Sequence, residues 1–142
     1  MIHPQLSEDD YSLVIRTDFS DDATWEHVCK LIQEPQTQDN FQAYVECISD
    51  TTCIGLTPEK VASVLPKDSH RTFAFLVDTV AIQNREHAVL VVDLAEDPGR
   101  SFRVIPSEAW GVQNNLSLAN MGFDEFAASV DTDGVFRGFP QP

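Results

Sequence analysis

Three stretches of consecutive apolar residues set the framework of the predicted fold. They lie within residues 13–17, 73–77 and 88–92, and a polar residue follows each of them. Uninterrupted apolar runs of this length are typical of strands that are buried on both faces of a sheet. Residues 41–47 instead alternate between apolar and polar side chains, which predicts a half-buried strand. Residues 101–105 alternate in the same way.

Three other segments show the apolar spacing of amphipathic helices. The first begins after Ser20, which is the expected N-cap because its side chain can accept a hydrogen bond from the first turn. The predicted buried stripe of this helix comprises Trp25, Val28 and Ile32. The other two helical segments are residues 57–65 and 123–130.

The order and lengths of these segments predict an α/β or α+β fold. The connection over residues 79–87 is shorter than the ~10–12 residues of an ordinary parallel crossover. An Asp-Pro-Gly turn at 97–99 predicts that residues 88–105 form an antiparallel hairpin ending on an edge strand. We therefore expect a mixed central sheet of about five strands with helices packed on it, followed by C-terminal helices. Residues 1–142 form one predicted domain, in which residues 1–11 are a polar arm.

The charge of the chain changes which partners this domain can have. Its 23 acidic residues outnumber its 9 lysines and arginines, which gives a formal net charge of −14. A phosphate backbone or an anionic membrane needs clustered positive charge, so we expect neither a nucleic-acid partner nor a membrane partner. A basic protein is the partner that this charge favours, because a field of one sign speeds encounter with the opposite sign.

The acidic residues are concentrated in the first third of the chain. Residues 1–50 hold 11 acids and 2 basic residues, a net charge of −9. Within them Asp21, Asp22 and Glu26 are predicted to lie on the first helix, away from its buried stripe, and form a candidate binding face. The alternative is a solvated acidic surface with no specific role.

A second candidate binding surface contains Asn114, Asn115 and Asn120. These amides could recognise a ligand, and a pocket between them and Trp110 would make the protein a small-molecule sensor. The alternative is that they form helix caps and turns, since asparagine serves both purposes.

An enzymatic alternative depends on Asp18, Asp78 and Asp93, which each follow a predicted buried strand. Ligands in open α/β sheets bind outside the carboxyl ends of the strands, and Mg²⁺ prefers carboxylate oxygens. Three parallel strands would therefore bring these residues together as the metal site of a hydrolase or phosphoryl-transfer enzyme. If the strands are not all parallel, the aspartates are turn and cap residues.

The sequence contains no motif that is typical of other catalytic chemistry. It contains no phosphate-binding G-x-x-x-x-G-K, no dinucleotide-binding G-x-G-x-x-G, no H-E-x-x-H and no nucleophile elbow. The three cysteines do not form C-x-x-C, and Cys29 fits the buried helical stripe. We expect no bound metal or cofactor. The N-terminal residues do not resemble a secretory signal, so we expect a cytoplasmic protein with reduced thiols.

Three strings of residues resemble a known family. They are residues 13–26, which run from Leu-Val-Ile-Arg-Thr-Asp to Trp-Glu; residues 91–104, with Val-Val-Asp-Leu and Phe-Arg-Val; and residues 114–126, which begin Asn-Asn-Leu-Ser-Leu. Together they resemble small acidic, mostly bacterial proteins catalogued as a domain of unknown function, over roughly residues 12–139. This resemblance implies no activity and no catalytic residue. From charge and absent motifs, we expect a small protein-binding module of the inhibitor, immunity or adaptor type.

Overall fold

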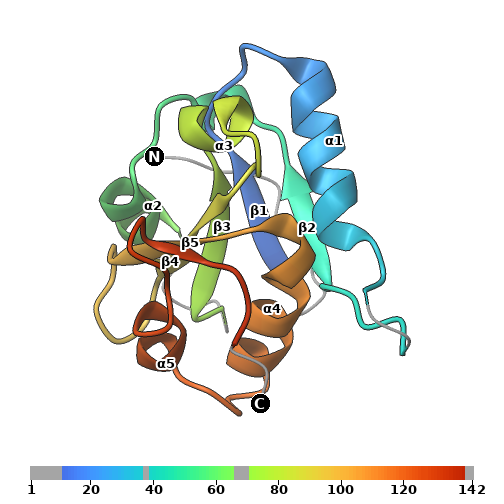
Figure 1. The fold of residues 1–142 in the computed structure, drawn as a ribbon. Coiled ribbons are helices and arrows are strands. Elements are labelled where there is room, and N and C mark those ends of the chain that lie inside the picture. Colours follow the sequence, from blue (N-terminus) through green and yellow to red (C-terminus); the bar gives the residue numbers. More distant parts are fainter. Residues whose placement is uncertain (1–10, 37–38, 66–70, 140–142) are drawn as a thin grey trace.

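A six-stranded mixed sheet forms the centre of the computed structural model, which describes residues 11–36, 39–65 and 71–139 (Figure 1). The strands lie in the order β2-β1-β3-β4-β5-β6. Their bounds are β1 Ser12–Arg16, β2 Val45–Ile48, β3 Phe73–Val77, β4 Val89–Asp93, β5 Ser101–Val104 and β6 Val135–Phe136. The predicted polar arm lies outside the described residues except for Tyr11.

The sheet is parallel at its two ends and antiparallel in its middle. β1 pairs in parallel with both β2 and β3, and β5 pairs in parallel with β6. β4 runs antiparallel to β3 and to β5. The chain between β3 and β4 holds only the short helix α3, Thr79–Gln83, which is too short to return the chain for a parallel strand. The mixed α/β sheet predicted from the sequence is thus confirmed.

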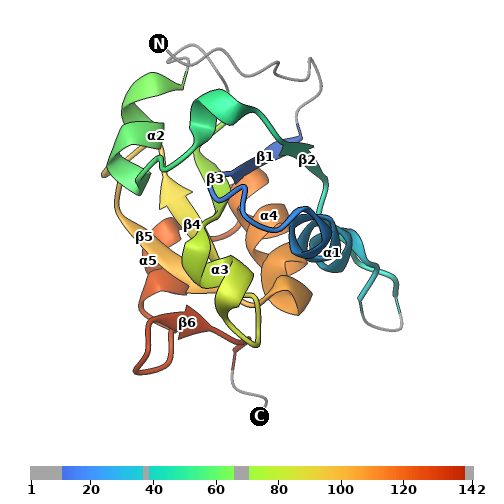
Figure 2. The ribbon, with the colours of Figure 1, turned by 90° about the horizontal axis from the view of Figure 1, so that it is seen from above.

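Helices cover both faces of the sheet. The helices are α1 Asp22–Gln33, α2 Pro58–Val64, α3, α4 Ala109–Ser117 and α5 Phe123–Ala127, with 3₁₀ turns η1 at Thr51–Cys53 and η2 at Pro106–Glu108. The larger core cluster joins one face to α1, α3, α4 and α5, and the smaller one joins the other face to α2 (Figure 2). Alternation along β1 explains both clusters, since Val14 belongs to the first, and Leu13 and Ile15 to the second. None of the helices in the described ranges is long and apolar enough to cross a membrane.

The main predicted elements are present, with three differences in detail. Trp25, Val28 and Ile32 are buried as predicted, and β1, β3 and β4 are interior strands. The N-cap of α1 is Asp21 rather than Ser20, because the Asp21 carboxylate accepts the Thr24 N–H. The strand predicted at 41–47 is β2, which begins only at 45. β6 is a sixth strand and pairs with β5, so the predicted hairpin does not end on an edge.

Candidate functional site

The three aspartates that follow strands do not lie together: two are at one end of the strands of the sheet, and the third is at the opposite end. Asp18 follows β1 and Asp78 follows β3, and these parallel strands end at the same edge. Asp93 ends β4, which runs antiparallel to β3 and pairs with it through Asp93 and Phe73. The three carboxylates therefore do not converge, and the geometry that the enzymatic alternative requires is not present. Within the described residues no group of three or more His, Cys, Asp or Glu side chains is placed to hold a metal.

Asp18 and Asp78 both have structural partners. Asp18 accepts hydrogen bonds from the Ser20 N–H at 2.8 Å and hydroxyl at 2.5 Å, and from the Thr79 hydroxyl at 2.7 Å. These bonds lower the pKa of the Asp18 carboxyl and keep it ionised. Asp78 caps α3 and forms an ion pair with Arg103 at 2.7 Å. Both residues therefore organise the start of the segment that follows their strand.

Asp93 has an equally structural environment at the other edge. Its side chain accepts the backbone N–H groups of Ala95 at 2.9 Å and Asp97 at 3.0 Å, and the Nε–H of Arg100 at 2.8 Å. Burial would raise its pKa, but these hydrogen bonds and the Arg100 charge outweigh burial and lower it. The carboxylate thus fixes the turn between β4 and β5.

Two of the asparagines predicted as a binding surface donate side-chain hydrogen bonds to backbone carbonyls. Asn114 donates to the Gln42 carbonyl at 3.1 Å, and Asn115 donates to the Gly111 carbonyl at 2.8 Å. The Asn115 carbonyl accepts the Asn120 N–H at 3.0 Å, which closes the C-terminal end of α4. Asn114 and Asn115 are therefore a loop anchor and a helix-end residue.

Two of the three acids on α1 also stabilise the fold. Asp21 is the N-cap of the helix. Asp22 forms an ion pair at 2.6 Å with Arg16, whose side chain is only 5% exposed whereas that of Asp22 is 85% exposed. The Arg16 guanidinium also stacks over Phe19, 4.3 Å from the ring centroid. Glu26 is exposed like the other two but forms no ion pair within the described residues, and it borders a pocket.

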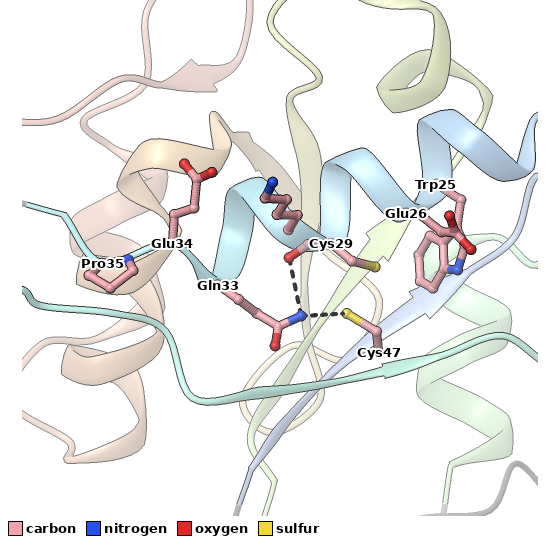
Figure 3. Close-up of a pocket in the computed structure, with 8 residues that line it drawn as sticks. Trp25, Glu26, Cys29, Gln33, Glu34, Pro35 and Cys47 are labelled. Carbon is pink, nitrogen blue, oxygen red and sulfur yellow. Dashed lines mark hydrogen bonds between the residues drawn. The ribbon is translucent and has the colours of Figure 1, made fainter.

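A pocket of about 540 Å³ opens between α1 and the edge strand β2. We call it the α1–β2 groove. Its lining residues are Trp25, Glu26, Cys29, Lys30, Gln33, Glu34, Pro35 and Cys47 (Figure 3). The helix brings most of these residues to one side because they recur at helical spacing, and Cys47 projects from β2 on the opposite side. The groove has an indole and two thiols in its wall and carboxylates at its rim.

Gln33 connects the two sides of the groove. Its amide donates to the Cys29 carbonyl at 3.2 Å and lies 3.5 Å from the Cys47 sulfur (Figure 3). The neighbouring Cys47 thiol, together with burial, raises the pKa of the Cys29 thiol. Cys29 therefore keeps its proton at neutral pH, beside the more accessible Cys47.

The charge around the groove is predominantly negative. Glu26, Lys30 and Glu34 are all exposed and follow one another at i,i+4 spacing, but no ion pair within 4.0 Å joins Lys30 to either glutamate. On β2, Glu46 has a carboxylate oxygen that is buried and accepts no hydrogen bond. Glu46 neighbours Cys47 in the strand, so its side chain points to the opposite face of the sheet.

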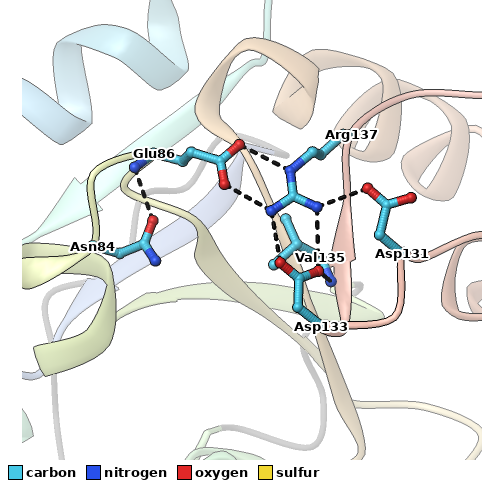
Figure 4. A network of polar contacts seen from close by, with 6 residues as sticks. All are labelled: Asn84, Glu86, Asp131, Asp133, Val135 and Arg137. Atoms are coloured by element: carbon cyan, nitrogen blue, oxygen red, sulfur yellow. Dashed lines mark hydrogen bonds and ion pairs between the residues drawn. The ribbon is translucent and has the colours of Figure 1, made fainter.

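At least four of the six arginines form ion pairs with carboxylates of the chain itself. Arg137 follows β6 and contacts Glu86, Asp131 and Asp133, each at 2.7 Å (Figure 4). Its hydrogen bonds lower the pKa values of Glu86 and Asp133. Arg16, Arg100 and Arg103 likewise form ion pairs within the domain. Much of the positive charge is thus neutralised locally, and the excess of acids faces solvent.

Comparison with known proteins gives a family but no activity. A family model described as Domain of unknown function (DUF6924) matches residues 11–139. No curated protein matches the chain.

Proposed function

The chain belongs to the DUF6924 family. We propose that it is a protein-binding module whose β2 edge takes up an extended, basic segment of its partner. The observation that carries the proposal is the position of the α1–β2 groove, whose wall is formed by the edge strand itself.

β2 offers backbone hydrogen bonds to a partner strand. It is the terminal strand of the sheet, and in the described part of the chain only β1 pairs with it. An edge strand presents unpaired N–H and C=O groups, which extended peptides use when they add a strand to a sheet. These main-chain bonds would supply affinity that depends little on the sequence of the partner.

The side chains of an added strand would face two different environments. Residues on one face enter the α1–β2 groove, where Trp25, Cys29 and Cys47 favour an apolar side chain. Residues on the other face lie beside Glu46, whose buried carboxylate oxygen lacks a hydrogen-bond donor. A lysine or arginine there would satisfy this oxygen across the strand pair. The preferred segment therefore alternates apolar and basic residues.

The charge of the domain supports the same partner chemistry. With a net charge of −14, the domain attracts a basic segment over about 8 Å at physiological salt. Glu26 and Glu34 place part of this field at the groove. Long-range attraction of this kind raises association rates more than it slows dissociation.

A random decapeptide phage-display library, selected on the immobilised full chain, tests the proposal. We expect enriched peptides to alternate apolar residues with lysine or arginine. Backbone amide chemical shifts should change along β2 and α1 when a selected peptide is added. The double variant E26K/E34K should weaken binding by roughly tenfold and lower the association rate. E46Q should reduce the preference for a basic residue.

The matched control is E59K/D97K, which makes the same change in net charge on exposed residues of α2 and of the β4–β5 turn. This control should bind nearly as well as the wild type. Enriched peptides without basic residues, or equal losses in the two double variants, would contradict the proposal. Dimerisation through β2, detected by light scattering, would assign the edge to a second copy of the chain instead.

A further inference from the structure

The chain holds two cysteines in one pocket and the third on the other side of the sheet. Cys29 on α1 and Cys47 on β2 both line the α1–β2 groove. Cys53, in η1, is buried in the smaller core cluster with α2. All three are free thiols in the structure. Only the first pair is therefore placed for a reaction between thiols.

The two thiols of the groove differ in access. The Cys29 residue is 8% exposed, whereas Cys47 is partly exposed and lies at the edge of the sheet. The Gln33 amide lies within 3.5 Å of the Cys47 sulfur and holds the backbone carbonyl of Cys29, so one side chain bridges both residues (Figure 3). An oxidant that enters the groove meets Cys47 first, with Cys29 behind it.

We propose that Cys29 and Cys47 are a reversible oxidation site for peroxides, and that their disulfide closes the α1–β2 groove. The Cys47 sulfur attacks one oxygen of hydrogen peroxide, so that an S–O bond forms as the O–O bond breaks and Cys47 becomes a sulfenic acid. The other peroxide oxygen takes up the thiol proton and leaves as water. The Cys29 thiol then gives up its proton to the sulfenic oxygen as its sulfur attacks the Cys47 sulfur. The new S–S bond forms as the S–O bond breaks, and the sulfenic oxygen leaves as the second water. A dithiol reductant reverses the reaction by thiol–disulfide exchange.

The disulfide would change the groove because its geometry is strict. The two sulfur atoms must come within about 2.05 Å of each other, with the Cα atoms about 4.4–6.8 Å apart. The bond would tie α1 to the edge strand across the groove and remove the Cys47 thiol from the Gln33 amide. This second half of the inference depends on the proposed function, since it is the entry of a partner side chain that the disulfide would block.

Mass spectrometry of the folded full chain tests the oxidation site without any peptide. The protein is treated with hydrogen peroxide, alkylated, and digested without reduction. We expect loss of two hydrogen atoms, a cross-linked fragment joining Cys29 to Cys47, and reversal by dithiothreitol. C53S should behave like the wild type. C29A should stop at the sulfenic acid, so that dimedone labels Cys47. C47S, changed at the less buried site, should form no intramolecular disulfide.

A selected basic peptide tests the effect on the groove. Oxidised wild type should bind it at least roughly tenfold more weakly than reduced wild type, and C29A/C47A should bind equally well with and without peroxide. A disulfide without any peptide binding would leave the oxidation site intact and contradict the binding proposal. Failure to form the Cys29–Cys47 bond in folded wild type, or a bond that involves Cys53, would overturn the oxidation site itself.

Discussion

At the scale of single residues, the buried acid Asp93 holds the β4–β5 turn in place. It is 2% exposed, and its carboxylate organises the β4–β5 turn through Ala95, Asp97 and Arg100. In D93N one oxygen becomes an amide NH₂ that faces donors, so we expect a loss of about 2–4 kcal/mol in the free energy of unfolding. Urea denaturation measures it. D97N, on the exposed side chain of the same turn, should change stability by less than about 0.5 kcal/mol.

The same substitution makes a pH prediction. The folded-state pKa of Asp93 is lowered, so its contribution is complete above its unfolded pKa of about 3.9 and disappears as the pH falls through the folded value. The difference in the free energy of unfolding between wild type and D93N should therefore be constant between about pH 5 and pH 7 and shrink below about pH 4. A difference that grew on acidification would show that Asp93 is not a stabilising carboxylate.

Single aspartates also show what the sequence could and could not predict of a site. The sequence places Asp18, Asp78 and Asp93 correctly after buried strands. Whether they converge depends on strand direction, which no local pattern encodes. All three side chains make the turn and cap contacts that are common for aspartates at strand ends.

At the scale of the helix, two adjacent residues, Ser20 and Asp21, are candidates for the N-cap of α1, and the structure shows that Asp21 is the cap. The Asp21 side chain accepts both the N–H and the hydroxyl of Thr24, at 3.0 and 2.6 Å, whereas Ser20 bonds to Asp18. D21A should therefore cost about 1 kcal/mol, and S20A less than about 0.5 kcal/mol. Urea denaturation of the two variants measures both costs. Equal costs, or a larger one for S20A, would place the cap at Ser20.

The elements that the sequence predicted best are those with long patterns. β3 is a run of five consecutive apolar residues, and the three middle residues of β1 are apolar; both runs predict strands directly. β6 has only two residues, and its position depends on Phe136, which packs edge-on against Phe126 at 5.2 Å between ring centroids. Such side-chain contacts between elements are absent from any local pattern, and the sheet has six strands where about five were predicted.

At the scale of the whole molecule, the α1–β2 groove is a product of topology. Cys29 lies on the buried stripe of α1, and Cys47 is one of the apolar positions of the alternating strand predicted at 41–47. The sequence alone therefore indicates which face of its element each cysteine occupies. Their meeting required two further facts: that β2 is the edge strand and that α1 covers the same face of the sheet. Neither follows from local spacing.

The net charge of −14 is also a property of the whole molecule, and it makes stability depend on salt. Raising ionic strength from 0.01 to 0.15 M shortens the Debye length from about 30 to about 8 Å, which screens repulsion among the exposed carboxylates. The arginine ion pairs weaken too, but exposed pairs contribute only about 0–1 kcal/mol each. We therefore expect the Tm of the protein to rise by a few degrees over this range.

The triple variant E26Q/E34Q/E59Q separates charge repulsion from other effects of salt. It removes three exposed carboxylates for which no side-chain ion pair exists within the described structure, and changes the net charge from −14 to −11. Its Tm should exceed that of the wild type at low salt, and the two should converge as salt screens the repulsion. Scanning calorimetry across the salt series measures both. A wild-type Tm that falls with salt would mean that the arginine ion pairs, rather than the repulsion among acids, dominate the electrostatics of the fold.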